Sequence, residues 1–163
     1  MRDSWYDTAQ ICLSGHIVNN SSIRYPLQNQ SFCQKCGEKT ITKCQKCDAK
    51  IRGEYHVEGV AAIGFIPTAD SYCHECGNPF PWTEGRLEAA KELADLLDHL
   101  DPKEIEDLKK SLDDLVKDGP RTVVATTKFK RIVSKTGPEI YQGFKDILVD
   151  VVSETVKKAI WGQ

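Results

Sequence analysis

The sequence predicts an α+β protein in which a small, metal-stapled β region is followed by an all-α helical region. Two observations predict this class. Six of the seven cysteines form three CxxC pairs, and all seven lie before residue 77. From Thr83 onward the chain has no cysteine, and apolar residues recur at the spacing of amphipathic helices. We therefore expect one domain over residues 1–82, held together by bound metal, and a helical domain over residues 83–163.

The composition is that of an ordinary soluble protein, with 40% hydrophobic and 28% charged residues in a chain of 163. The chain has no run of about 18 apolar residues, the length needed to cross a bilayer. Its first residues, MRDSWYDTAQ, lack the basic and then apolar pattern of a secretory signal. We therefore expect a cytoplasmic protein with no membrane partner. In that reducing compartment, closely spaced cysteines more often bind metal than form disulfides.

The three CxxC pairs have the local pattern of zinc ligands. Two residues between the cysteines allow a tight turn that points both sulfur atoms at one ion. A residue that tolerates positive φ usually follows, because the chain must turn back there. Gly37, Asp48 and Gly77 occupy these positions, and aspartate is one of the few other residue types that tolerate such a conformation.

Two zinc ions need eight ligands, and the three pairs supply six. Cys12 is the seventh, and His16 is the best candidate for the eighth, because the segment CLSGH places it four positions on with Gly15 in the turn. His56 and His74 are alternatives, but His74 lies between two ligands and His56 fits a strand. The predicted cofactors are two structural zinc ions, with iron as the alternative metal. The predicted ligands are Cys12, His16, Cys33, Cys36, Cys44, Cys47, Cys73 and Cys76.

These residues form four half-sites, and the sequence favours pairing them in order along the chain. The segments FCQKCG at 32–37 and YCHECG at 72–77 share an aromatic residue before the first cysteine and a glycine after the second, as if each closed one of two repeats. Sequential pairing would join 12/16 with 33/36 and 44/47 with 73/76. A crossed pairing and a nested pairing, which would join the two CQKC segments, stay open.

These motifs resemble those of double zinc-ribbon proteins, in which two small hairpin-built zinc units stand in tandem. The resemblance covers about residues 10–82 and implies a double zinc-ribbon domain there. With IRG at 51–53 and PFPWTE at 79–84, the whole chain resembles an uncharacterised bacterial family of zinc-ribbon proteins with a helical C-terminal region. Neither resemblance implies catalytic residues.

A helical hairpin is predicted over residues 84–118. Leucines and alanines from Leu87 to Leu100 recur at helical spacing, and Asp101, Pro102 and Glu104 form a start signal for a second helix. Because the joint spans only two residues, the helices must fold back on each other. Gly119 and Pro120 end the second helix.

Two further helices are predicted, at about 122–135 and 138–161. The first is ambiguous, because its β-branched residues also suit a strand, but Ala125, Phe129 and Ile132 fit a helical stripe. The second has one long apolar face and ends near Lys157 and Lys158, which suit the negative pole of the helix dipole.

The charges differ between the regions, with net values of 0 over 1–82, −6 over 83–118 and +4 over 119–163. The acidic hairpin and the basic tail can pair with each other, or one of them can dock a partner. Closed metal sites and the absence of HxE and HExxH motifs argue against an enzyme. We expect a zinc-binding, non-catalytic adaptor or protein-interaction protein, with self-association through the C-terminal helix as a further expectation.

Nucleic-acid binding is the alternative function. It would use the basic segment 35–52, and its candidate contacts are Lys35, Lys39, Lys43, Lys46, Lys50 and Arg52. The same side chains can instead offset the negative charge of the metal-bound thiolates. The neutral first region and the acidic chain as a whole favour the protein partner.

Overall fold

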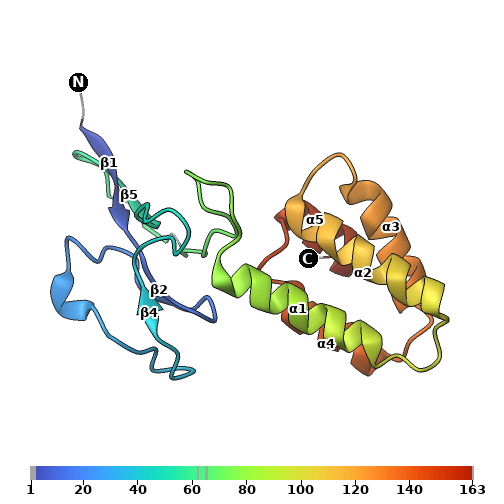
Figure 1. Ribbon diagram of the computed structural model, residues 1–163. Coiled ribbons are helices and arrows are strands. Elements are labelled where there is room, and N and C mark those ends of the chain that lie inside the picture. Colours follow the sequence, from blue (N-terminus) through green and yellow to red (C-terminus); the bar gives the residue numbers. More distant parts are fainter. Residues whose placement is uncertain (1–2, 62, 65, 163) are drawn as a thin grey trace. The chain divides into compact units, whose positions relative to one another are not determined.

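The computed structural model describes residues 3–61, 63–64 and 66–162. The chain folds into two compact units, residues 1–83 and 84–163. The first unit holds all the strands and the second nearly all of the helical structure (Figure 1). Small antiparallel sheets followed by five helices give the α+β layout that the sequence predicts.

Two small sheets build the first unit. Strand β1 (Ser4–Thr8) pairs antiparallel with β5 (Arg52–Val57), although the two strands lie far apart in the sequence. In the other sheet, β2 (Gln10–Cys12) lies between β3 (Ile17–Asn19) and β4 (Thr40–Ile41). A short 3-10 turn, η1 (Pro26–Gln28), lies in the connection between β3 and β4.

Gly53 allows another segment to cross close to β5. A Cβ atom at this position would lie 2.1 Å from the carbonyl oxygen of Asn20 and 2.8 Å from the amide nitrogen of Ala9. The close approach lets the amide of Glu54 donate to the Asn20 carbonyl at 2.9 Å. The IRG segment therefore needs its glycine for packing, because any side chain would push the backbones apart.

The first unit has a small core that includes cysteines. Ile11, Ile51, Phe80 and Trp82 are buried together with Ala9, Cys44 and Cys73. The rings of Phe80 and Trp82 stack with their centroids 4.6 Å apart, and the Trp82 indole donates to the carbonyl of Asp70 at 2.8 Å. Small cores of this kind gain stability from additional cross-links such as bound metal.

The second unit contains α1 (Pro81–Asp95), α2 (Pro102–Lys117), α3 (Thr122–Val133), α4 (Pro138–Leu148) and α5 (Glu154–Trp161). Helix α1 begins in the last residues of the first unit. Helix α2 begins with the expected capping box, in which Asp101 accepts from the Glu104 amide at 2.9 Å and the Glu104 carboxylate accepts from the Asp101 amide. Segment 122–133 is helical, as the stripe of apolar residues favours.

Two predicted helix boundaries are wrong. The first helix ends at Asp95, not near Leu100, so six residues connect it to α2. The predicted helix over about 138–161 is two helices, because α4 ends at Leu148 and Ser153 caps α5 by accepting from the Val156 amide. Val151 and Val152, which lie between the two helices, are buried, and the break in the helix allows both side chains to pack inside the unit.

Aromatic and aliphatic side chains form the core of the helical unit. Phe129 of α3 and Phe144 of α4 are fully buried and meet edge to face, with ring centroids 5.5 Å apart. The other fully buried large side chains, all under 2% exposed, are Leu108, Leu112, Leu115, Ile132, Val133, Leu148 and Val156. This unit therefore has a continuous apolar core of its own.

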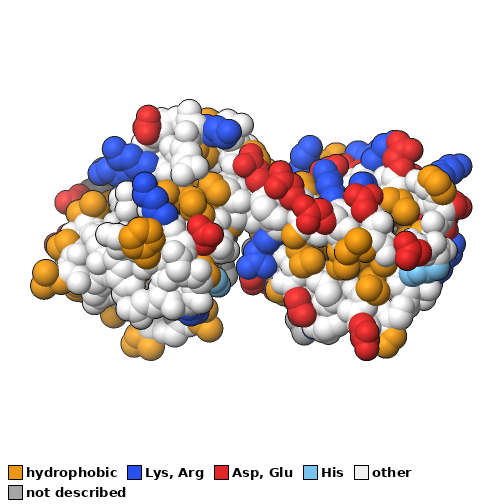
Figure 2. Space-filling view, turned by 60° about the horizontal axis from the view of Figure 1, so that its bottom comes forward, with side chains coloured by type: hydrophobic (Ala, Val, Ile, Leu, Met, Phe, Trp, Pro, Cys, Tyr) orange, Lys and Arg blue, Asp and Glu red, His pale blue; other side chains and the backbone are white. Residues whose placement is uncertain are grey.

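Ion pairs join the acidic helices to their basic neighbours. Asp114 and Asp107 of α2 pair with Arg121 and Lys128 at 2.8 and 3.2 Å. Lys91 of α1 pairs with Asp113 at 2.7 Å. Figure 2 shows acidic and basic side chains interspersed over the visible face of this unit. Glu104 and Lys135 form a third pair between the acidic segment 83–118 and the basic segment 119–163. Part of the charge difference between these segments is thus paired inside the unit, although exposed pairs contribute only about 0.2–1 kcal/mol each.

Among the residues that the structure describes, no helix combines the length and the apolar character needed to cross a membrane.

Candidate metal centres

The three CxxC segments fold into the same local turn. In each, the amide of the first cysteine donates to the carbonyl five residues on, at 2.8–2.9 Å, and the carbonyl of that cysteine accepts from the amide four residues on, also at 2.8–2.9 Å. The donor of that second bond is Gly37, Asp48 or Gly77, with φ of 75°, 60° and 68°. We call these turns knuckle 1 (33–37), knuckle 2 (44–48) and knuckle 3 (73–77).

Each knuckle lies inside a minimal hairpin. The residue before the first cysteine forms an isolated antiparallel bridge with the residue six positions after that cysteine: Phe32 with Lys39, Lys43 with Lys50, and Tyr72 with Pro79. Knuckle 2 therefore has the same structure as the other two, although it lacks their aromatic residue and their glycine. The CxxC spacing and Asp48 predict this turn from the sequence, although the aromatic residue and the glycine shared by 32–37 and 72–77 are absent from 43–48.

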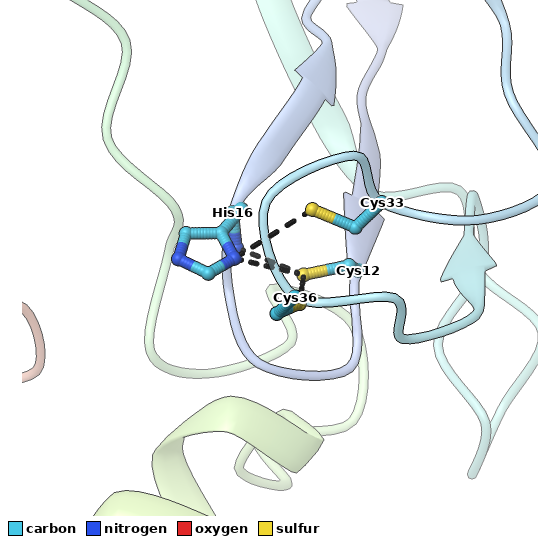
Figure 3. Close-up of side chains that lie close together, drawn as sticks. All are labelled: Cys12, His16, Cys33 and Cys36. Carbon is cyan, nitrogen blue, oxygen red and sulfur yellow. Dashed lines mark hydrogen bonds between the residues drawn. The ribbon is translucent and has the colours of Figure 1, made fainter.

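The first metal group consists of Cys12, His16, Cys33 and Cys36. Cys12 ends β2, and His16 follows the turn in which Gly15 has φ of 89°. The His16 Nδ1 atom lies 3.5 Å from the Cys12 sulfur and 3.7 Å from the Cys33 sulfur, and the Cys12 and Cys36 sulfurs are 3.7 Å apart. Figure 3 shows the imidazole facing the cysteine sulfurs from the loop after β2.

The second metal group consists of Cys44, Cys47, Cys73 and Cys76, from knuckles 2 and 3. The Cys44 and Cys76 sulfurs are 3.8 Å apart, and those of Cys47 and Cys73 are 3.7 Å apart. The backbone amide of Lys46 donates to the Cys44 sulfur at 3.5 Å. In both groups all ligand atoms lie within 4.8 Å of one another.

These distances fit a tetrahedral ion. Zinc–sulfur bonds of about 2.3 Å place two sulfurs of a tetrahedron about 3.8 Å apart, and a zinc–nitrogen bond of about 2.0–2.1 Å places sulfur and nitrogen about 3.5 Å apart. Three separations in the first group are 3.5, 3.7 and 3.7 Å, and two in the second are 3.7 and 3.8 Å. These separations are compatible with two metal sites.

The grouping follows the order of the chain. Cys12 and His16 lie with Cys33 and Cys36, so the first CQKC segment joins the first group and the second CQKC segment joins the other. The two histidines considered as alternative ligands, His56 and His74, belong to neither group. The His74 Nε2 atom lies 3.4 Å from Glu75, and the His56 Nδ1 atom lies 3.1 Å from the guanidinium of Arg24.

In every knuckle the first cysteine is buried and the second is exposed. Burial raises the pKa of the Cys12 thiol to about 11. A hydrogen bond from the Asn78 side chain lowers the pKa of the Cys76 thiol to about 6. Since a metal binds the thiolate, metal binding at neutral pH must displace the proton of Cys12.

The six basic candidates are distributed over two knuckles and one strand. Lys35 and Lys39 lie in and beside knuckle 1, Lys43, Lys46 and Lys50 in and beside knuckle 2, and Arg52 opens β5. All six side chains are exposed. Arg52 stacks over the ring of Tyr6, and among the described residues none of the five lysines has a side-chain ion pair or hydrogen bond.

Comparison with known proteins gave one result. Residues 5–160 match the model of a family described as "Uncharacterized protein conserved in bacteria (DUF2321)". The match covers both units. No curated protein and no solved structure matches the chain.

Proposed function

We propose that this chain, which belongs to the bacterial DUF2321 family, is a non-catalytic adaptor in which two structural zinc ions build a platform for a protein partner. The observation that carries this proposal is the completeness of the two metal groups. Each offers four soft or borderline donors at tetrahedral spacing, so each ion would be fully coordinated by the protein.

Zinc suits the donor set of the first group in particular. Three cysteines and one histidine form a standard structural zinc site, whereas rubredoxin-like iron uses four cysteines. The second group has four cysteines and matches either metal by donor type. We assign zinc to both groups because their knuckles share one structure.

A closed site supports a structural role instead of a catalytic one. Catalytic zinc keeps an open coordination position for water or substrate, and four protein ligands leave none. The two ions would join segments that are distant in sequence, from Cys12 to Cys36 and from Cys44 to Cys76. In a unit with a small core, these cross-links would supply most of the folding free energy.

The surface of the first unit supports a protein partner. Leu27, Ile63 and Ile66 are 100%, 94% and 83% exposed, and apolar side chains that gather in one exposed patch are typical of interaction surfaces. The other exposed large apolar side chains of this unit are Trp5, Tyr6, Ile23, Tyr25, Phe32, Tyr55 and Val60. The adaptor would work in the cytoplasm, where the thiols stay reduced.

Metal analysis of protein purified without chelator tests the zinc sites. We expect two zinc ions per chain, one for each group. One ion per chain, or iron, would contradict the proposed sites. Partner proteins captured from native cells by the zinc-loaded chain should be lost with a chelator-treated chain, because the platform would unfold.

Nucleic-acid binding through residues 35–52 is a second candidate, and one observation favours it. Lys35, Lys39, Lys43, Lys46 and Lys50 have no side-chain partners among the described residues, whereas the helical unit pairs Lys91, Lys109, Lys128 and Lys135 with carboxylates. The simpler alternative is that these lysines offset the metal-bound thiolates. Binding to labelled oligonucleotides that weakens as the salt concentration rises would distinguish the two.

A further inference from the structure

We propose that a surface of the first unit formed by Tyr6, Lys50, Arg52 and Tyr55, here called the tyrosine–arginine face, binds single-stranded nucleic acid by stacking bases on its rings. The face adds β1 and the end of β5 to the basic segment 35–52 considered above. It depends on the proposed zinc platform, because Lys50 lies beside knuckle 2 and is held in place by the second metal group.

Two tyrosines form a half-exposed pair of aromatic rings. Tyr6 of β1 and Tyr55 of β5 are directly opposite in the antiparallel register, and their ring centroids are 4.7 Å apart. The two residues remain 51% and 49% exposed, although the guanidinium of Arg52 lies over the ring of Tyr6. Exposed aromatic rings on strands are the usual platform on which unpaired bases stack, regardless of base sequence.

Arg52 places a cation over the ring of Tyr6. Its guanidinium carbon lies 4.8 Å from the centroid of Tyr6, within the range of a cation–π contact. Arginine in this arrangement can stack on a base and also donate to a phosphate. A pocket of about 640 Å³ opens here, and its lining includes Tyr6, Lys50, Arg52 and His74.

Lys50 and Lys43 together favour an anionic ligand. They lie directly opposite each other in the bridge that flanks knuckle 2, and no carboxylate pairs with either side chain among the described residues. Like charges in directly opposite positions repel each other and destabilise a β pair. A phosphodiester backbone passing along the hairpin would relieve this repulsion.

The acidic groups near the face are mostly engaged. The carboxylate of Asp7 accepts hydrogen bonds from the amides of Thr8, Ile23 and Arg24. Glu75 contacts His74 at 3.4 Å. Asp70 is close enough to Arg52 to interact with it, and four thiolates around one Zn²⁺ leave a net charge of about −2 in the second group. The negative charge of the second metal group offers a competing explanation for the unpaired Lys43 and Lys50, because both lysines can offset it.

Single strands fit the face better than duplexes. Bases in a duplex are stacked on each other and do not expose their faces, whereas an unpaired base can place its ring on Tyr6 or Tyr55. Three cations, Lys43, Lys50 and Arg52, are few for a protein that binds by charge alone. Stacking would therefore supply a large share of the affinity, and the salt dependence should be shallow.

The test is fluorescence anisotropy of a labelled oligouridylate of about ten nucleotides, titrated with the zinc-loaded full chain at several salt concentrations. We expect binding with a slope of log affinity against log salt of about −2, from three phosphate contacts. Tyr6→Ala combined with Tyr55→Ala should weaken binding by roughly tenfold or more, because each stacked base is worth that much. Lys50→Gln should flatten the slope by about 0.7.

Matched controls separate recognition from folding. Tyr25→Ala removes another half-exposed tyrosine that also lies under an arginine, Arg24, and should leave the affinity unchanged. Zinc content is measured for every variant. If wild-type protein with two zinc ions binds no oligouridylate at low salt, the face is not a nucleic-acid site and the adaptor proposal is unaffected.

Two other outcomes would also overturn the proposal. Equal losses in the tyrosine variants and in Tyr25→Ala would show unspecific binding. If Lys50→Gln lowers zinc affinity while oligonucleotide binding is absent, the lysines serve to offset the thiolates. A wild-type chain with no bound zinc would instead contradict the proposed function itself, so the two failures are distinguishable.

Discussion

Replacing Cys44 with serine should unfold the first unit and leave the helical unit folded. Cys44 is buried in the core of the first unit, and its sulfur lies 3.8 Å from that of Cys76 in the second metal group. A serine hydroxyl is a poor zinc ligand, so the group would keep three donors. Cys44→Ser therefore removes a metal cross-link and also places a polar atom in the core.

The expected magnitude exceeds the stability of the unit. Structural zinc in small domains contributes apparent binding free energies of about 10–16 kcal/mol. A folded unit of 83 residues has a total unfolding free energy of about 4–12 kcal/mol at typical values per residue. Among the described residues, the buried core of this unit consists of Ala9, Ile11, Ile51, Phe80 and Trp82 with two cysteines, and four partly buried apolar side chains pack against it. We expect a core of this size not to replace the lost metal.

The assay combines metal analysis with circular dichroism. The helices contain 15, 16, 12, 11 and 8 residues, nearly all in the second unit, so the helical signal should stay close to that of the wild type. Zinc content should fall from two ions to one or fewer, and protease should cut within 1–83. Gln45→Ser, an exposed change in the same knuckle, serves as the control.

Either of two results would refute this reasoning. A Cys44→Ser protein that retains two zinc ions would show that the sulfur is not a ligand. A helical signal that melts together with the first unit would show that the two units fold as one.

Three further predictions concern the core, the strand crossing and pH. Phe129→Ala should lower the unfolding free energy of the helical unit by about 3–5 kcal/mol in urea titrations, because it leaves a cavity beside Phe144. The zinc content should stay at two ions per chain. A loss of unfolding free energy below about 1 kcal/mol would contradict the packing. Gly53→Ala should destabilise the first unit by about 1–3 kcal/mol or more, since the alanine Cβ would lie 2.1 Å from the Asn20 carbonyl oxygen. The loss of stability should appear as faster transfer of zinc to a chelator. An unchanged transfer rate would refute the close crossing. Burial raises the pKa of Cys12 to about 11, so the metal-free thiol is protonated at neutral pH. The apparent zinc affinity of the first group should therefore rise with increasing pH. Calorimetry in buffers of different ionisation enthalpy should detect the protons released on binding, and their absence would contradict the prediction.

The local turns around the metal ligands were predictable because they depend on few residues. Two residues between cysteines and a following Gly37 or Gly77 specify a turn that aims both sulfurs at one point. Helix starts were predictable for the same reason, since Asp101 and Glu104 are only three residues apart. The ends of helices were less predictable: the apolar pattern continues past Asp95 and past Leu148, but the backbone leaves the helix at both places to bury Leu97 and Val151.

By itself, the sequence determined the metal-binding half-sites, the division near residue 83 and the amphipathic helices, since each follows from side-chain types at short, regular spacing. Only the tertiary structure decided which half-sites share a group, because Cys44 and Cys73 are brought together by the fold of the whole unit and not by their spacing. It also decided that Tyr6 lies opposite Tyr55 and under Arg52, in strands separated by more than forty residues of sequence. Contacts of this kind depend on how several segments pack at once, and no local pattern encodes that.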